Sequence, residues 1–407
     1  MTCGSRNVLF PFRGEEFGGS HISSIGLIKA LDRKLWRPIV VLLDGGGELA
    51  ALLTAHGIDF VAGPSTNLPG RLRIGSRTGF GQLAMPFLGC IGPFTRFLRE
   101  NQIAIVHTND GEMHAAWSLP ARLAGVRHVW HHRADPETRG VNLLAPILAS
   151  HIVSVSGFAS PASPILPISH KLSVIHSPFD HPMQTPDRSE ARRAVLSHLG
   201  LREDTRILSY FGTLIARKRP RVFIDVVRRF TERYPDVPVA GLVFGVPVED
   251  VGADRTAEAY ARDLGIGDKI HFMGFRSPVE TWMCGTDVLL VPAVREPFGR
   301  TLIEAMLLGT PVVATNSGGN PEAIENEVTG FLVPPDDPDA FLEPVHRILT
   351  DRSLRNRIAE AAGAAARSAY STSTHVQKIS DLYASLLRHK TAFKGSFEIP
   401  RERRSSP

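Results

Sequence analysis

Residues 287–335 read DVLLVPAVREPFGRTLIEAMLLGTPVVATNSGGNPEAIENEVTGFLVPP, and the order of elements in this stretch decides the fold. It opens with a short apolar run, 288–291, which is typical of a buried strand. After a loop, residues 300–308 have the spacing of a helix that Gly309 ends. A second apolar run, 311–314, follows at once. A strand, a helix and another strand in this order predict a unit of parallel sheet.

Short apolar runs and helical stretches alternate along most of the chain. We expect helices at 22–31, 49–56 and 115–124, and strands at 8–10, 39–43, 103–107, 128–130, 152–155, 207–211, 239–244, 270–273, 288–291 and 312–314. A polar, proline-rich stretch, 177–188, interrupts the alternation and is the candidate linker. We therefore predict an α/β fold with two Rossmann-like parallel-sheet domains that face a central cleft.

Length and composition agree with two globular domains. A chain of 407 residues exceeds what one hydrophobic core usually supports, and 43% hydrophobic with 21% charged residues is ordinary for a globular protein. Three widely spaced cysteines predict neither a disulfide framework nor a zinc site and favour a reducing compartment. The first residues do not resemble a secretory signal, and no apolar run approaches the roughly 20 residues of a membrane span. The net charge of +5 is modest, and we expect no nucleic acid partner.

Two glutamates flank the start of the helix expected at 300–308. Glu296 lies in the preceding loop and Glu304 lies more than a turn inside the helix. Gly299 allows a ligand to approach the backbone closely, and the free N–H groups of a helix start favour a phosphate. This segment therefore offers a hydrogen-bond acceptor for sugar hydroxyls, an anion site and a second carboxylate for a ribose.

The spacing Glu296-x7-Glu304, with Phe298-Gly299 inside it and Gly-Gly-Asn-Pro-Glu at 318–322, resembles the donor site of the family-4 retaining glycosyltransferases, which have the GT-B fold. The resemblance implies that Glu296 contacts the transferred sugar and that Glu304 contacts the ribose hydroxyls. It also implies that the residues around the helix start bind the donor, namely Phe298, Gly299 and Arg300.

The loop 212–220, which follows an expected strand, supports the same resemblance. In the family this loop is similar to Gly-Arg-Leu-x-x-x-Lys-Gly, whose arginine and lysine neutralise the donor diphosphate. Lys218 falls on the lysine, but Thr213 stands in place of the arginine and Arg219 in place of the second glycine. Arg217 and Arg219 are both candidates to replace the missing charge.

Two further segments resemble parts of the same site in the first half of the chain. Gly18 and Gly19 precede an expected helix and resemble a first loop whose backbone amides close over the donor. The residues 130–133 are Trp-His-His-Arg, at the end of an expected strand. Similar enzymes place a histidine there that faces the transferred sugar, and sometimes an arginine two residues later. Because side chains alternate along a strand, only one histidine faces the cleft; we favour His131, with His132 as the alternative.

The resemblance implies a retaining hexosyltransferase that uses a UDP or GDP sugar, and we expect it to need no metal or other cofactor. Its catalytic candidates are Glu296, His131 and Lys218. The aspartate-rich turn 336–339 is not a metal site because it does not end a strand, and 79–84 is not a dinucleotide fingerprint because no strand precedes it. The acceptor is a glycan, a lipid-linked sugar or a small molecule. Thr213 favours one alternative, a non-catalytic nucleotide-sugar-binding partner in a polysaccharide assembly complex, and a nucleotide-sugar epimerase of the same fold is another.

The resemblance also divides the chain. We predict an acceptor-side domain at 1–180, a donor domain at 181–373, a helix at 374–389 that returns to the first domain, and a basic, disordered tail at 390–407.

The segment 64–82 contains Arg71, Arg73 and Arg77 between apolar side chains and has no acidic residue. It predicts either contact with an anionic membrane surface or a loop that closes over the acceptor. We expect the protein to be cytoplasmic, with peripheral attachment to the inner face of the membrane as the second hypothesis.

Overall fold

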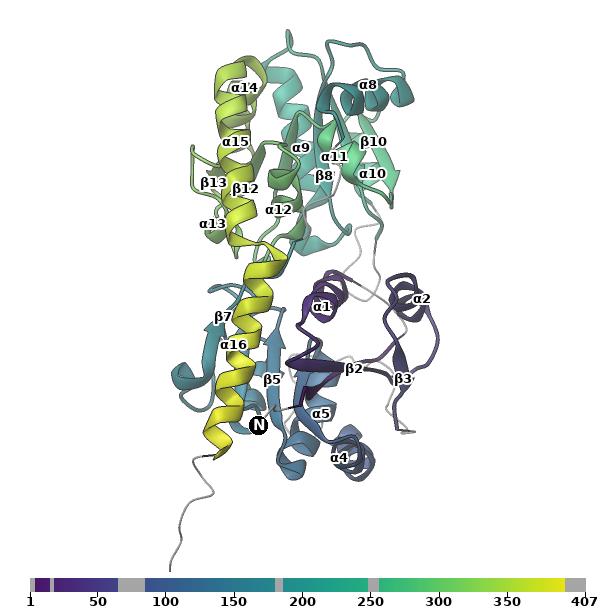
Figure 1. Cartoon of the computed structure of the whole chain (residues 1–407). Helices are drawn as coiled ribbons and strands as arrows, with labels where there is room; N and C mark the ends of the chain where they lie inside the picture. The colour runs from purple at the N-terminus through teal and green to yellow at the C-terminus, as the bar shows by residue number, and fades with distance from the viewer. Residues whose placement is uncertain (1–3, 15–17, 65–84, 180–185, 248–255, 392–407) are drawn as a thin grey trace, which may run out of the picture.

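The computed structural model describes residues 4–14, 18–64, 85–179, 186–247 and 256–391, and it shows two domains stacked one above the other (Figure 1). In the described part of the first domain, seven strands form one sheet in the order β3-β2-β1-β4-β5-β6-β7, with every neighbouring pair parallel. The strands are β1 (Arg6–Phe12), β2 (Trp36–Leu42), β3 (Phe60–Ala62), β4 (Ile103–Thr108), β5 (Arg127–His132), β6 (His151–Ser154) and β7 (Leu172–Val174).

Helices cover both faces of this sheet. They are α1 (Gly19–Ala30), α2 (Glu48–Ala55), α4 (Ile91–Glu100), α5 (Gly111–Ala124), α6 (Arg139–Leu143) and α7 (Ala145–Leu148), with short 3-10 turns η1 (Met85–Cys90) and η2 (Ser169–Lys171). Burial on both faces explains why the strands are apolar runs with little alternation.

The described part of the second domain has a six-stranded parallel sheet in the order β10-β9-β8-β11-β12-β13. The strands are β8 (Arg206–Phe211), β9 (Val239–Phe244), β10 (Ile270–Gly274), β11 (Val288–Val291), β12 (Val312–Thr315) and β13 (Phe331–Val333). The helices and turns are α8 (Arg188–Leu199), η3 (Ala216–Lys218), α9 (Pro220–Arg233), α10 (Ala257–Asp263), α11 (Glu280–Cys284), α12 (Arg300–Leu307), α13 (Asn320–Ala323), η5 (Pro338–Phe341), α14 (Leu342–Thr350) and α15 (Arg352–Ala369).

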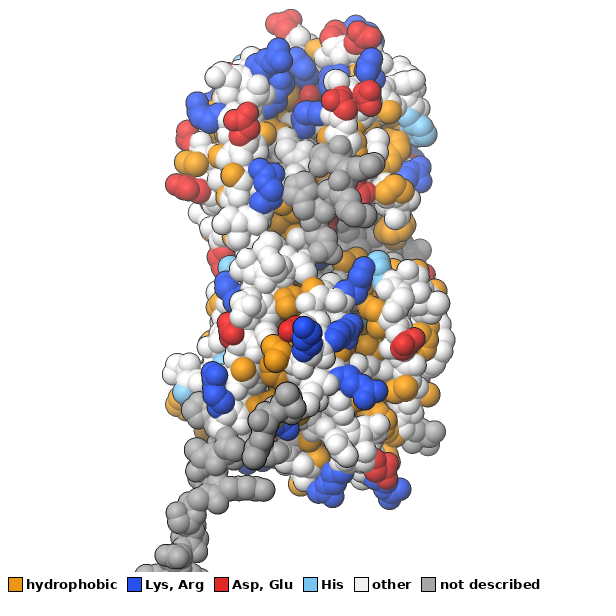
Figure 2. All heavy atoms as spheres, viewed as in Figure 1, with side chains coloured by type: hydrophobic (Ala, Val, Ile, Leu, Met, Phe, Trp, Pro, Cys, Tyr) orange, Lys and Arg blue, Asp and Glu red, His pale blue; other side chains and the backbone are white. Residues whose placement is uncertain are grey.

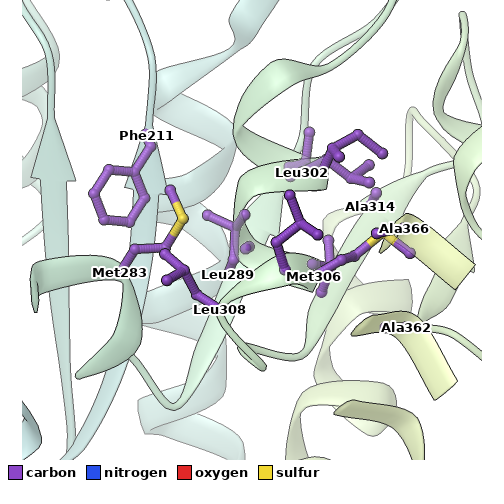
Figure 3. Close-up of a cluster of buried hydrophobic side chains, with 14 of the residues drawn as sticks. Phe211, Met283, Leu289, Leu302, Met306, Leu308, Ala314, Ala362 and Ala366 are labelled. Atoms are coloured by element: carbon purple, nitrogen blue, oxygen red, sulfur yellow. The ribbon is translucent and has the colours of Figure 1, made fainter. Parts of the chain in front are cut away.

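Helix α12 is anchored in a core of apolar side chains, so its first residue is held at a defined place. Leu302 and Met306 of this helix are fully buried against Leu289 of β11 and against Ala362 and Ala366 of α15 (Figure 3). Close packing of this kind makes the helix a rigid support for the loop that precedes it.

The last helix, α16 (Thr372–Thr391), leaves the second domain and runs along the first (Figure 1). Its Ile379 and Tyr383 are fully buried in the core of the first domain, and Ser380 accepts a hydrogen bond from Trp36 (2.7 Å). The two chain segments that connect the domains touch each other, because the N–H of Phe179 donates to the carbonyl of Tyr370 (2.9 Å). The chain therefore passes between the domains at two adjacent places, near Phe179 and near Tyr370.

The prediction of two Rossmann-like parallel-sheet domains is confirmed, and every strand and helix expected above has a counterpart. The short strands β3, β7 and β13 were not predicted, because runs of three residues carry too little pattern. The predicted domain limits stay predictions, and most of the tail at 390–407 lies outside the described residues.

Surface charge on the face shown in Figure 2 is mixed: lysine and arginine side chains lie among acidic and apolar ones over both domains. Arg71, Arg73 and Arg77 all lie outside the described residues, so the membrane hypothesis stays a prediction. Among the helices that the structure describes, none is long and apolar enough to cross a bilayer.

Candidate functional site

A cavity of about 500 Å³, called here the cleft cavity, lies between the two domains at the carboxyl ends of their strands. Loops after β5, β6 and β7 line one side, and loops after β8 and β11 with the start of α12 line the other. The charged side chains that line it are Arg133, Arg217, Lys218, Arg295 and Arg300, with Asp135 and Glu296. Positive charge is in excess, which is the electrostatic setting for an anionic ligand.

Gly318 and Gly319 allow the loop after β12 to pack against the loop that carries Glu296. The N–H of Gly319 donates to the carbonyl oxygen of Glu296 (2.8 Å). A Cβ atom on Gly318 would lie 2.5 Å from that oxygen, and the φ angle of Gly318 is +63°. Only glycine meets both conditions without strain, which explains the Gly-Gly pair seen in the sequence.

The Glu296 carboxylate is held by two of the predicted cations. Its Oε2 atom forms an ion pair with Arg217, and the Nζ atom of Lys218 lies 3.8 Å from the same oxygen. The Glu296 side chain is only 13% exposed, so these charges interact in a partly desolvated place. Lys218 reaches the carboxylate by passing over Gly212, where a Cβ atom would lie 3.0 Å from the Cδ atom of Lys218.

The structure distinguishes the two arginines that were candidates to replace the missing cation at Thr213. Arg217 lines the cleft cavity, whereas Thr213 does not. Arg219 points away, since its guanidinium pairs with Asp336 (2.7 Å) and donates to a backbone carbonyl. Its φ angle of +53° keeps the left-handed conformation that favours glycine, the family residue at this position.

Arg300, the first residue of α12, crosses the cleft to the first domain. Its Nη1 atom donates to Ser23 of α1 (2.9 Å), and its Nη2 atom contacts Glu304 (3.1 Å). The guanidinium carbon lies 4.4 Å from the centre of the Phe179 ring. Gly19 makes room for this side chain, because a Cβ atom there would lie 2.7 Å from the Cδ atom of Arg300.

Glu304 lines a separate cavity of about 300 Å³ between α1 and α12. Arg300 lines both cavities, so it connects the cavity that Glu296 lines with the cavity that Glu304 lines. A ligand with a sugar at one end and a ribose at the other matches this order.

The remaining predicted donor residues lie near the cleft cavity in different ways. Phe298 lines it and stacks on His176 (ring centres 4.9 Å apart). Gly299 is the N-cap residue of α12. Gly18 is the N-cap residue of α1, and its N–H already donates to the Nδ1 atom of His21 (3.0 Å).

A second cavity of about 570 Å³, called here the first-domain cavity, lies at the ends of β4 and β5. Arg133 lines both cavities and so connects them. Asp110, the N-cap residue of α5, lines the first-domain cavity and accepts the N–H of Met113 (2.9 Å). Burial raises the pKa of Asp110 to about 6, and the negative charge of Glu112 adds to that rise.

The expectation that His131 faces the cleft is not met. His131 is fully buried and lines neither of these two cavities, whereas His132 lines the first-domain cavity. The reason is the direction of alternation in β5, which turns His131 toward the face that α16 covers, where its ring stacks on His375 (5.9 Å). The assignment of His131 as a catalytic residue stays a prediction.

His131 belongs to a buried chain of polar side chains. Tyr383 contacts the Nδ1 atom of His107 (2.5 Å), and the Nε2 atom of His107 contacts the Nδ1 atom of His131 (3.0 Å). Arg133 donates to that same Nδ1 atom (3.3 Å). Because a guanidinium only donates, the Nδ1 atom of His131 accepts and the ring is neutral. Burial and the charge of Arg133 lower the pKa values of both histidines well below their usual range, which agrees with neutral rings.

Two contacts across the domain boundary were not predicted. The Glu322 carboxylate accepts the N–H groups of Gly157 (2.7 Å) and Phe158 (2.8 Å) in the loop after β6. Arg295 forms a bidentate ion pair with Asp135 (3.0 and 3.1 Å). Sequence alone offered only the position of Glu322 in the Gly-Gly-Asn-Pro-Glu motif, and it offered no signal for the Arg295 pair. Within the described part of the chain, no group of three or more His, Cys, Asp or Glu side chains has the arrangement of a metal site.

Two Rossmann-like domains with a cation-lined cleft between them have the architecture of the GT-B fold. The chain superposes on the Anabaena protein HepE in its complex with UDP-glucose with a TM-score of 0.75, at 22% identity, over 93% of this chain and 99% of that one. It superposes on a glycosyltransferase from Rickettsia africae with a TM-score of 0.73, at 18% identity, over 94% and 99% of the two chains. The predicted GT-B fold is confirmed.

Sequence comparison matches part of the second domain to a protein family. Residues 192–364, within the second domain, match the family described as glycosyl transferases group 1. A D-inositol 3-phosphate glycosyltransferase of Corynebacterium urealyticum is 33% identical over 225 residues, which cover 54% of this chain and 52% of that protein. The match thus spans about half the length of this curated relative. The resemblance to GT-B glycosyltransferases that the donor motif predicted is confirmed.

Proposed function

We propose that the protein transfers a hexose-type sugar from a UDP or GDP sugar to a hydroxyl group of an acceptor, with retention of configuration and without a metal. The observation that carries this proposal is the cleft cavity, where Arg217 and Lys218 pair with the carboxylate of Glu296 and Arg300 lines the same cavity. A nucleoside diphosphate leaving group needs such cations, and a sugar hydroxyl needs such an acceptor.

The geometry supports one direction for the donor. Its transferred sugar lies by Glu296, its diphosphate lies by Lys218 and the start of α12, and its ribose lies by Glu304 in the smaller cavity. The UDP-glucose in the HepE complex supports UDP as the nucleotide. The first-domain cavity, which Arg133 connects to the cleft cavity, is the place for the acceptor. The inositol phosphate named for the curated relative supports a small hydroxylated ring as one acceptor class.

The chemistry that these residues supply is positioning and charge compensation. As the bond between the sugar and the phosphate breaks, negative charge grows on the leaving phosphate, and the fixed cations stabilise it more than they stabilise the bound donor. In a front-face substitution, this phosphate also accepts the proton of the attacking hydroxyl. Retention follows because the acceptor attacks from the side that the leaving group vacates.

Turnover of the donor tests the proposal. Wild-type protein in EDTA should release UDP or GDP from the matching sugar nucleotide, and Glu296→Ala should abolish this release while donor binding remains. NMR of the anomeric proton of the product reports whether configuration is retained. Tight donor binding without turnover would favour the non-catalytic binding protein, and release of an epimerised free sugar without acceptor would favour the epimerase.

A further inference from the structure

Within the described part of the chain, Arg133 is a cation whose hydrogen-bond partners, Asn109, His131 and Ser177, are all neutral groups. All three guanidinium nitrogens donate to neutral groups: Nη1 to the Ser177 hydroxyl (2.8 Å), Nε to the Asn109 amide oxygen (3.3 Å) and Nη2 to the Nδ1 atom of His131 (3.3 Å). Among the described residues, no carboxylate forms an ion pair with Arg133. A partly buried arginine normally has such a partner, because burial of an unpaired charge is costly.

The three neutral contacts hold Arg133 in place without neutralising it. Each terminal nitrogen carries a further N–H that the described residues do not use. A neutral His131 ring accepts a hydrogen bond from the Arg133 guanidinium and does not repel its charge. The chain of hydrogen bonds from Tyr383 through His107 to His131 therefore orients the guanidinium without adding a positive charge beside it. Burial and, to a smaller extent, repulsion from Arg300 together lower the pKa of Arg133 to about 9.

The two arginines that repel each other come from different domains. Arg133 follows β5 in the first domain, Arg300 begins α12 in the second, and both line the cleft cavity. Arg300 pairs with the carboxylate of Glu304, whereas Arg133 pairs with no carboxylate of the described residues, so the two arginines and Glu304 together carry a net positive charge. An anion between them would relieve both the desolvation of Arg133 and the repulsion.

We propose that Arg133 and Arg300 form a phosphate site that spans the two domains, and that its ligand is the sugar-linked phosphate of the donor. This inference rests on the proposed function and adds to it a cation from the acceptor-side domain. Arg133 then contacts the phosphate on which charge grows, at the boundary with the first-domain cavity. His131 is a positioning residue, since it acts on the phosphate through Arg133.

Equilibrium binding tests this site in the full chain. Isothermal titration calorimetry with UDP and UMP, and with GDP and GMP, compares wild type with Arg133→Gln. Because the proposed ligand is the distal phosphate, Arg133→Gln should lower the affinity for the diphosphate about tenfold to a hundredfold and the affinity for the monophosphate less than about threefold. Arg122→Gln, at an exposed arginine that donates to the carbonyl of Ile147, is the control and should change neither.

A phosphate of the acceptor is the other possible source of the anion. In that case Arg133→Gln leaves the diphosphate affinity unchanged but removes the thermal stabilisation that inorganic phosphate gives to the wild-type protein. This result would overturn the assignment of the ligand as the donor phosphate, and it would support a phosphate site at Arg133. Unchanged responses to both ligands would overturn the site itself. If wild type binds no nucleoside diphosphate, the proposed function fails, and the inorganic phosphate comparison still decides on the site.

Variants of His131 separate positioning from a purely structural role. His131→Asn places an amide oxygen close to where the Nδ1 atom accepts, so it should keep most of the diphosphate affinity. His131→Leu should lower the diphosphate affinity about as much as Arg133→Gln does. The double variant, with His131→Leu and Arg133→Gln together, should bind the diphosphate no more weakly than Arg133→Gln alone. Additive losses would overturn the claim that His131 acts through Arg133. Should Arg133→Gln fail to fold, Ser177→Ala removes one support of the guanidinium and should lower diphosphate affinity in the same direction.

Discussion

Arg217 forms an ion pair with Glu296, which lies 79 positions later in the sequence. The pair joins the turn after β8 to the loop after β11. Lys218 approaches the same oxygen. A donor that enters the cleft cavity therefore meets a carboxylate and cations that are already organised, which lowers the reorganisation needed during reaction.

The two glutamates of the donor motif should respond differently to removal. Glu304→Ala should weaken donor binding more than it slows turnover, because ribose contacts are the same in the bound donor and in the transition state. Glu296→Ala should mainly lower kcat, since its partner is the sugar whose charge changes. Steady-state kinetics with the donor varied give both constants, and near wild-type values for both variants would remove the donor-site assignment.

Lys218→Ala should reduce kcat/KM by the equivalent of about 2–4 kcal/mol, which is the usual scale for one electrostatic contact in a catalytic site. Arg219→Ala is the matched control from the same turn. Its guanidinium points away from the cleft cavity to the largely exposed Asp336, so we expect a change of less than about 1 kcal/mol. Equal losses in the two variants would contradict the orientation of this turn.

Gly318→Ala should destabilise the protein strongly, because a Cβ atom would lie 2.5 Å from the Glu296 carbonyl oxygen and 2.6 Å from its nitrogen. Gly309→Ala is the control: its φ angle of +72° is also left-handed, but no atom lies within 4 Å of a Cβ atom there. Urea unfolding should show a loss of about 1 kcal/mol in the free energy of unfolding for Gly309→Ala and a loss about 2–3 kcal/mol larger for Gly318→Ala. The same cost at both positions would mean that the loop adapts easily.

Asp110 should make stability depend on pH. Its pKa is raised from 3.8 to about 6 in the folded protein, so it adds stability that is fully present below its unfolded pKa and is lost as the pH rises through about 6. Between pH 5 and pH 7.5 this loss is about 1 kcal/mol. Asp110→Asn keeps an N-cap oxygen but cannot ionise.

The difference in free energy of unfolding between Asp110→Asn and wild type should therefore be about 1 kcal/mol more favourable to the variant at pH 7.5 than at pH 5. Urea unfolding at the two pH values measures this difference. A difference that does not change with pH would show that the carboxyl group ionises normally.

The sequence predicted the fold, and the structure brings Lys218 and Glu296 of the second domain together at one cavity, for a physical reason. Buried parallel strands are apolar runs, and the glutamates, glycines and Lys218 lie on loops directly after them, so their place follows from strand ends alone. The orientation of His131 did not follow, because strand alternation says that neighbours face opposite sides but not which side α16 covers. Arg133 was noted only as an arginine that sometimes follows the histidine, since its contacts with Asn109 and Ser177 join segments that are 24 and 44 positions away in the sequence.

The measurement that tests the central claim most directly is calorimetric titration of the wild-type protein and of Lys218→Ala with UDP, GDP and ADP and their hexose derivatives, in EDTA. The account predicts that UDP or GDP and the matching sugar nucleotide bind with one ligand per chain, and that Lys218→Ala weakens this binding at least about tenfold. Absence of binding by all of these nucleotides, or binding that Lys218→Ala leaves unchanged, would contradict a nucleotide-sugar site in the cleft.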